Sequence, residues 1–263
     1  MIGQVQDGIE ACQDECDRLV AERDAFQTFL RYVRSINTVG TNSSSESAPS
    51  QSGIKHPTIT NSDPQDATVK GVLSAYKQTV QSLPHYRDEY DETLTESLSA
   101  ELGQDIATSL ATNNVLVPAT KRALVERSQQ AIDSRTNLLE AIATEIDALT
   151  DAQTDLETIE TRKQKLRAHL ESVERNRSEA AFDVLCVLRD LESDVDTIAQ
   201  KRQERLQDPP VKVGETSTDR TNDTGFYVYL YSVEGVPRYP VLSAVAELGT
   251  AIQTEQDWIL KQL

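Results

Sequence analysis

The densest cluster of side chains able to do chemistry is the run His85-Tyr-Arg-Asp-Glu-Tyr-Asp-Glu92. His85 and Glu89 are four residues apart, so in a helix they share one face, where they could hold a metal ion or pass a proton with Asp88. A di-iron carboxylate site would need paired Glu-x-x-His motifs, and the sequence contains none. A hydrogen bond or ion pair on a helix surface is therefore the expected role. A metal site centred on His85 and Glu89 is the alternative.

Two cysteines, Cys12 and Cys16, also lie one helical turn apart and could share a metal ion. A tetrahedral site needs two more ligands, and the remaining cysteine and histidines have no zinc-binding spacing. These residues are Cys186, His56, His85 and His169. We therefore expect both thiols to pack as small apolar side chains. The sequence predicts no catalytic residue, no bound metal and no cofactor.

One local concentration of basic residues could contact nucleic acid or an acidic partner. It consists of Arg162, Lys163, Lys165, Arg167, Arg175 and Arg177. More often such a run is a solvated helix face, here paired with Glu160, Glu171 and Glu174. Nucleic-acid binding is thus an alternative to a plain charged surface.

Aromatic side chains gather near the carboxyl end, where a partner could dock. The candidate contact residues are Phe226, Tyr227, Tyr229, Tyr231, Tyr239 and Trp258. Residues 226–231 alternate as in a short strand, although a helix of one or two turns is equally compatible. Pro240 suits the first position of a last amphipathic helix. We expect the aromatic residues to fix that helix to the bundle end, and a docking patch is the alternative.

The stretch of residues 119–208 carries the basic run and organises the rest of the chain. It contains no Gly or Pro, and its apolar residues recur every three or four positions, as in a coiled coil or a long antiparallel bundle. Glu145, Lys163 and Arg177 interrupt this apolar stripe. The stretch is either one helix or a hairpin that turns near residues 174–178, where Asn176 and Glu179 have the spacing of a capping box.

Composition divides the rest of the chain. Residues 1–38 predict a heptad helix, and residues 39–65 a flexible Ser, Thr and Pro-rich linker. Residues 66–208 predict a helical bundle that includes the long stretch. Residues 209–225 predict a second linker, and residues 226–263 an aromatic segment followed by a helix.

The net charge of −17 comes from 43 acidic and 26 basic residues. The excess is evenly spread, as for a solvated acidic surface, and it favours a salt-adapted, halophilic protein. An ordinary acidic coiled coil is the alternative. Such a charge disfavours general attraction to phosphate backbones, so nucleic acid is an unlikely partner. The amino end does not resemble a secretory signal, and no apolar run is long enough to cross a bilayer. We expect a cytoplasmic protein with no membrane contact.

Several segments together resemble a haloarchaeal family of uncharacterised helical proteins with a domain of unknown function. The segments are Tyr76 to Tyr86, Glu89-Tyr90, Leu94, Glu101-Leu-Gly103, Arg135 with Glu145, Arg202-Gln203, Tyr229-Leu-Tyr231 and Tyr239-Pro-Val-Leu242. The resemblance covers residues 66–260. It implies a helical fold and a cytosolic location, and it implies no activity.

We predict an all-α fold, an elongated antiparallel coiled-coil or helical bundle with a small carboxy-terminal helical cap. The predicted function is a non-enzymatic scaffold or adaptor that binds a protein partner or itself through its heptad stripes. A metal-binding enzyme or sensor at His85 and Glu89 is the first alternative. A nucleic-acid-associated protein is the second.

Overall fold

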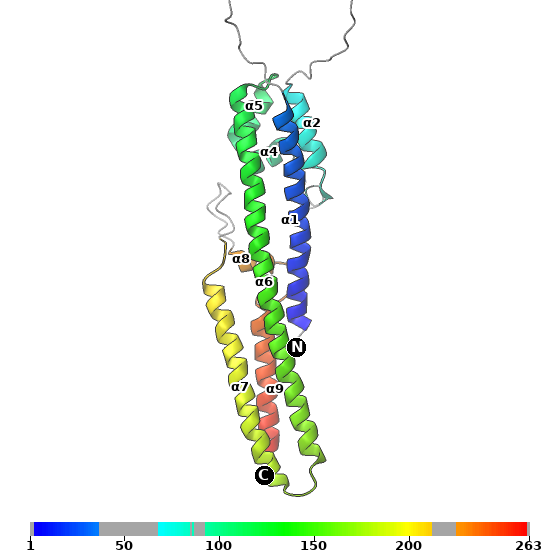
Figure 1. Cartoon of the computed structure of the whole chain (residues 1–263), viewed down its shortest axis with the longest axis vertical. Coiled ribbons are helices and arrows are strands. Elements are labelled where there is room, and N and C mark those ends of the chain that lie inside the picture. Colours follow the sequence, from blue (N-terminus) through cyan, green and yellow to red (C-terminus); the bar gives the residue numbers. More distant parts are fainter. Residues whose placement is uncertain (1–2, 37–67, 85, 87–92, 212–224, 262–263) are drawn as a thin grey trace, which may run out of the picture. The chain divides into compact units, whose positions relative to one another are not determined.

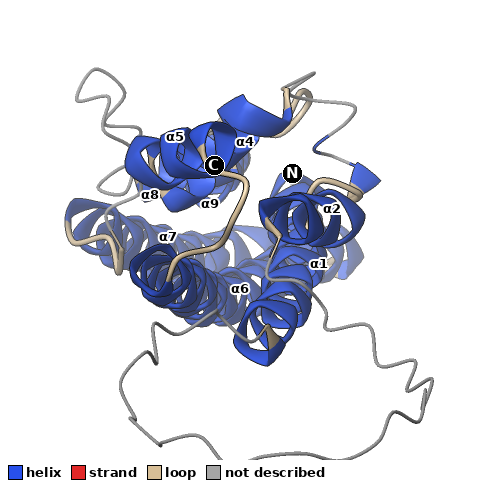
Figure 2. Ribbon diagram, turned by 90° about the horizontal axis from the view of Figure 1, so that it is seen from above, coloured by secondary structure: helices blue, strands red, loops and turns tan. Residues whose placement is uncertain are grey.

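The structure is a computed structural model that describes residues 3–36, 68–84, 86, 93–211 and 225–261. Within these residues every named element is a helix, and the only β pairing is an isolated bridge between Thr68 and Val115. Figure 2 accordingly shows helices and loops and no strand in this part of the chain. The all-α prediction is confirmed.

The described chain forms two compact units. The terminal unit contains Met1–Arg18 and Asn137–Leu263, and the inner unit contains Leu19–Thr136. Helices α1 (Gly3–Ser35) and α6 (Pro118–Ser172) each contribute to both units. Both boundaries between the units therefore fall inside helices. The linker predicted at residues 39–65 and most of the one predicted at 209–225 lie outside the described residues.

The inner unit packs short helices against α1 and α6. These are α2 (Val69–Thr79), α4 (Leu94–Leu102) and α5 (Gln104–Thr112). Its core centres on Tyr76, whose ring meets Phe26 and Phe29 edge to face at centroid distances of 6.5 and 5.3 Å. The buried hydroxyl of Tyr76 lies 3.0 Å from that of Ser97, so its polar end is also satisfied.

Local sequence signals explain the boundaries of these short helices. A capping box between Thr93 and Glu96 begins α4. Gly103, with a φ of 98°, separates α4 from α5 because other residues rarely adopt this conformation. Pro118 begins α6, since a first-turn residue needs no backbone donor.

The terminal unit is built from long helices. α7 (Arg177–Gln207) and α9 (Pro240–Leu260) lie beside the second part of α6 (Figure 1). The side chains of Gln253 and Gln256 on α9 donate to Glu192 on α7 at 2.9 and 3.2 Å. The last helix is therefore a full layer of this unit, larger than a small cap. The short element α8 (Phe226–Leu230) shows that the aromatic segment is a helix and not a strand.

The long stretch of residues 119–208 is a helical hairpin and not one helix. α6 ends at Ser172, α7 begins at Arg177, and Asn176 between them has a left-handed φ of 55°. The predicted capping box is wrong, because the side chain of Asn176 caps no backbone amide and instead donates to the Glu179 carboxylate at 3.5 Å. A left-handed residue reverses the chain where no Gly is present, and Asn tolerates this conformation better than most residues.

The apolar stripe predicted along this stretch faces the interior of the protein. Apolar residues of the stripe at seven-residue spacing are buried, namely Ile142, Leu149, Leu156, Leu170, Val184, Leu191 and Ile198. Two of the polar interruptions flank the turn. Lys163 pairs with Glu160 at 2.7 Å, and Arg177 is the first residue of α7. Whether the stripes interlock as in a coiled coil stays a prediction.

The left-handed conformation of Asn176 leads to a testable prediction. Asn176→Gly should leave the free energy of unfolding unchanged within a few tenths of a kcal/mol, because Gly adopts this conformation freely. Asn176→Val should lower it by about 1–2 kcal/mol, because a β-branched side chain is strained there. Urea unfolding followed by circular dichroism measures both values. Equal stability of the two variants would show that residue 176 is not left-handed.

Candidate functional site

The most buried charged pair in the terminal unit joins α6 to α7. Arg202 donates two hydrogen bonds to the Glu145 carboxylate, from Nη1 at 3.1 Å and from Nη2 at 2.6 Å. The two side chains are only 4% and 1% exposed. A planar guanidinium matches a carboxylate in this paired geometry, which fixes the position of one helix along the other.

Two tyrosines from the α8 region complete this network. Tyr231 donates its hydroxyl proton to Glu145, and Tyr227 donates to the backbone carbonyl of Arg205 at 3.0 Å. The guanidinium of Arg202 lies 5.1 Å from the centre of the Tyr227 ring, a cation–π distance. Burial and the charge of Glu145 raise the pKa of Tyr231, so the phenol stays a proton donor. We call Glu145, Arg202, Tyr227 and Tyr231 the terminal network.

Cys12 on α1 packs against the terminal network. Its side chain is fully buried, and burial together with the charge of Glu145 raises the pKa of its thiol to about 12. Burial also raises the pKa of Cys16, whereas Cys186 on α7 is exposed. All three are free cysteines. Cys12 thus packs as predicted, as a neutral apolar side chain.

The raised pKa predicts the order in which the cysteines react. The thiolate is the nucleophile, and a pKa of about 12 instead of 9.0 lowers its fraction at Cys12 about a thousandfold. At pH 8, iodoacetamide should therefore alkylate Cys186 first and Cys12 last. Peptide mass spectrometry over time measures the three rates, with the urea-unfolded protein as the control in which the rates converge. Fast alkylation of Cys12 in the folded protein would show that its thiol is not buried beside Glu145.

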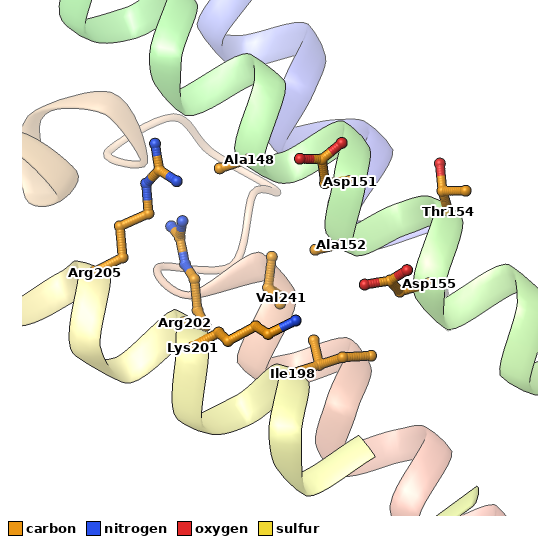
Figure 3. A pocket seen from close by; sticks show the side chains of 10 residues that line it. All are labelled: Ala148, Asp151, Ala152, Thr154, Asp155, Ile198, Lys201, Arg202, Arg205 and Val241. Atoms are coloured by element: carbon orange, nitrogen blue, oxygen red, sulfur yellow. The ribbon is translucent and has the colours of Figure 1, made fainter. Parts of the chain in front are cut away.

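A pocket of about 360 Å³ lies beside the terminal network, between α6, α7 and the start of α9 (Figure 3). Arg202 belongs both to the network and to the pocket wall. α7 also supplies Lys201 and Arg205, and α6 supplies Asp151 and Asp155. The pocket thus has a basic wall and an acidic wall. Its volume is near the lower end of the range for small-molecule sites.

A second network, which is part-buried, joins three helices of the inner unit. Arg135 on α6 donates to Glu22 on α1 at 2.6 Å and to both oxygens of Glu101 on α4 at 2.9 and 3.0 Å. It also donates to the hydroxyl of Tyr86 at 3.2 Å and lies 4.6 Å from the centre of the Phe26 ring. We call Arg135, Glu22, Glu101 and Tyr86 the inner network.

The protonation states of the inner network follow from its charges. Burial alone would lower the pKa of Arg135, but the charges of Glu101 and Glu22 raise it overall. Burial and Glu101 raise the pKa of Tyr86, whose hydroxyl donates to that carboxylate. The arginine therefore stays charged and the tyrosine stays neutral, as expected of a structural cluster.

The predicted metal candidates His85, Asp88 and Glu89 lie outside the described residues. Tyr86, in the same run, is described and belongs to the inner network. Among the described residues, no three His, Cys, Asp or Glu side chains form a group that could hold a metal ion.

The predicted docking aromatics have different environments. Phe226, Tyr227 and Tyr231 are buried in the terminal unit. Tyr229 donates its hydroxyl proton to Glu15, and Trp258 lies 5.4 Å from the guanidinium of Arg167. Of the six, Tyr239 is an exposed large apolar side chain, at 41%. The other five aromatic residues mainly attach α8 and α9 to the terminal unit. This is the role of fixing the last helix in place, and not that of a docking patch.

Two members of the basic run are paired with carboxylates. Lys163 contacts Glu160 at 2.7 Å, and Arg167 contacts Glu171 and Glu255, both at 3.1 Å. The pairings with Glu160 and Glu171 are those expected of a charged helix face. Glu255, on α9, was not foreseen as a partner.

Sequence patterns missed the partners in both networks. Glu145 was recognised as an interruption of the apolar stripe, but nothing in the pattern indicated Arg202. For Arg135, no sequence pattern indicates a role, and the residue is named only as part of the family resemblance. Several residues that carried the resemblance are members of the networks. They are Tyr86, Glu101, Arg135, Glu145, Arg202 and Tyr231.

Comparison with known families confirms one part of this resemblance, the domain of unknown function, and extends it beyond residues 66–260 toward the amino end. Residues 3–256 match the family described as "Domain of unknown function (DUF7260)", so the chain belongs to that family. Searches of curated proteins and of solved structures found no match. In the part of the chain that the structure describes, none of the helices has the length and apolar character needed to span a membrane.

Proposed function

We propose that this protein is a non-enzymatic helical scaffold or adaptor, and that it binds another protein through the exposed face of α7 around Phe182. Phe182 is 62% exposed, more than any other large apolar side chain in the described residues. Cys186, four residues on, is also exposed and shares its helix face. The Phe182 side chain is the single observation that carries this proposal.

The opposite face of α7 supports this role because it is firmly held. Val184, Leu188 and Leu191 are buried, and Arg202 is held by Glu145 farther along the helix. A surface that is already ordered loses little conformational entropy on binding. Burying the Phe182 ring against a partner would contribute about 1.5–3 kcal/mol, as aromatic anchors do at interface centres.

The proposed setting is a salt-adapted cytoplasm. The net charge of −17 would repel other acidic surfaces at low ionic strength. Concentrated salt screens charges over a few ångströms, which leaves apolar contacts such as Phe182 as the main source of affinity. The nucleic-acid alternative has less support, because Lys163 and Arg167 are already paired with carboxylates. A metal-binding function at His85 and Glu89 is the other alternative. Elemental analysis of the purified protein distinguishes this function from that of a scaffold.

Photo-crosslinking tests the proposal. Benzoylphenylalanine at position 182 keeps an aromatic ring on the proposed face. The same group at Gln200, exposed on the same helix about 27 Å away, is the matched control. After irradiation in lysate at high KCl, mass spectrometry identifies the crosslinked proteins.

We expect one protein, or a second copy of this chain, to crosslink from position 182 and not from position 200. Phe182→Glu should then weaken its co-purification at least tenfold, because a charge would be buried at the contact. Identical crosslinking from both positions, or none from position 182, would refute the proposed face.

A further inference from the structure

Arg202, a residue of the pocket wall, carries a buried donor without a partner in the described part of the chain. The residue is buried, its two terminal amino groups bind Glu145, and its Nε has no hydrogen-bond partner among the described residues. Arg202 also lines the pocket (Figure 3). An unsatisfied buried donor costs free energy, and a ligand atom in the pocket could accept its hydrogen bond.

Other features of the same wall favour a negatively charged group there. Lys201 precedes Arg202 on α7, and Figure 3 shows the Lys201 side chain reaching toward α6. Arg205 completes this wall, but its guanidinium already lies 3.9 Å from the Glu145 carboxylate and donates to the backbone carbonyl of Thr144 at 2.9 Å. Val241 is the second residue of α9, whose first turn has no side-chain cap. The partial positive charge of an uncapped helix start adds to that of the cations.

The opposite wall carries the opposite charge. Asp151 and Asp155 lie four residues apart on α6, so both are on one helix face. Both are exposed, and neither forms an ion pair or hydrogen bond through its side chain with the described residues. Lys201 is also exposed and likewise pairs with none of them. The two walls therefore have charges available for a ligand that carries both signs.

We propose that this pocket binds a small zwitterion of the α-amino acid class. The carboxylate of the ligand accepts hydrogen bonds from Arg202 Nε and Lys201, and its ammonium group lies against Asp151 and Asp155. Ala148, Ala152 and Ile198 supply the apolar part of the wall. A simple anion would leave the two aspartates facing it, and a simple cation would face the basic wall.

The test measures the binding of free amino acids to the purified full chain. The standard L-amino acids are screened one at a time by thermal shift at constant KCl, and stabilising ones are titrated by calorimetry. For each binder, the matching carboxylic acid without the amine and the matching amine without the carboxylate are the ligand controls. We expect at least one amino acid to bind, and both of its truncated analogues to bind at least tenfold more weakly.

Pocket variants locate the site. Asp155→Asn and Lys201→Gln change exposed side chains, so both should fold, and each should weaken binding about tenfold or more. Asp190→Asn, an exposed change about three turns away on α7, should leave the affinity unchanged. The proposal is overturned if no amino acid binds, if a truncated analogue binds equally well, or if the pocket variants retain full affinity.

Discussion

Replacing Glu145 by alanine is expected to lower the free energy of unfolding by about 3–5 kcal/mol, the largest effect of a single substitution in the terminal unit. The loss is large because Arg202 would keep its charge in a site where it is 4% exposed. It would also lose two hydrogen bonds, and Tyr231 would lose its acceptor. Chemical denaturation of the purified protein at constant KCl measures the change.

Two further variants show whether the loss of stability comes from leaving a buried charge unpaired or simply from removing a glutamate. Glu140→Ala removes an exposed glutamate from the same helix and should change stability by less than about 0.5 kcal/mol. The double variant Glu145→Leu/Arg202→Met removes both charges together and should recover much of the lost stability. If Glu145→Ala were as mild as Glu140→Ala, the pair would not be buried in solution.

Replacing Arg135 by methionine is expected to have an effect of similar size in the inner unit, also about 3–5 kcal/mol. This substitution keeps much of the apolar volume but leaves Glu22 and Glu101, which are 13% and 20% exposed, facing each other without a counter-charge. The contact with the Phe26 ring would lose its cation. Thermal and urea unfolding measure the loss.

The geometry of the guanidinium supplies a stricter control. Arg135→Lys keeps the charge but presents its donors from a single nitrogen, which cannot reproduce the forked contacts with Glu22 and Glu101, so it should restore only part of the stability. Arg122→Met removes an exposed arginine from the same helix and should be nearly neutral. Full recovery with lysine would show that charge alone, and not the forked geometry, holds α1, α4 and α6 together.

Much of the fold was predictable because backbone signals act locally. The absence of Gly and Pro from residues 119–208 predicted long helices, and α6 begins at Pro118, the residue just before this stretch. The turn at Asn176 was harder to recognise. Its left-handed conformation requires neither Gly nor Pro, and the apolar stripe continues through it without a change of phase. Periodicity could therefore not distinguish a hairpin from one helix.

The networks were less predictable because they join residues far apart in the chain. Glu145 stood out as a charge on an apolar stripe, but its partner depends on where the chain turns. Once the turn is placed near residues 173–176, antiparallel helices bring Glu145 opposite Arg202, and the pair could then have been inferred. No such rule identifies Arg135, whose partners Glu22 and Glu101 come from two other helices.

The role of the aromatic segment was difficult to predict from the sequence for a different reason. Clustered Phe and Tyr residues indicate an apolar contact, but the sequence does not say whether the contact is internal. Burial of Phe226, Tyr227 and Tyr231 shows that most of this surface is used within the terminal unit. Phe182 was not singled out, because an apolar residue within a long heptad pattern does not reveal which face stays uncovered.

α6 and α7 fold back on each other and are held in place by Glu145 and Arg202. The most direct test is a distance between spin labels at Thr150→Cys and Thr197→Cys, two exposed positions, with the exposed Cys186 replaced by serine. The hairpin predicts about 20–30 Å, because packed helices lie about 10 Å apart and the labels add the rest. A distance near 70 Å, as in one continuous helix, would contradict the account.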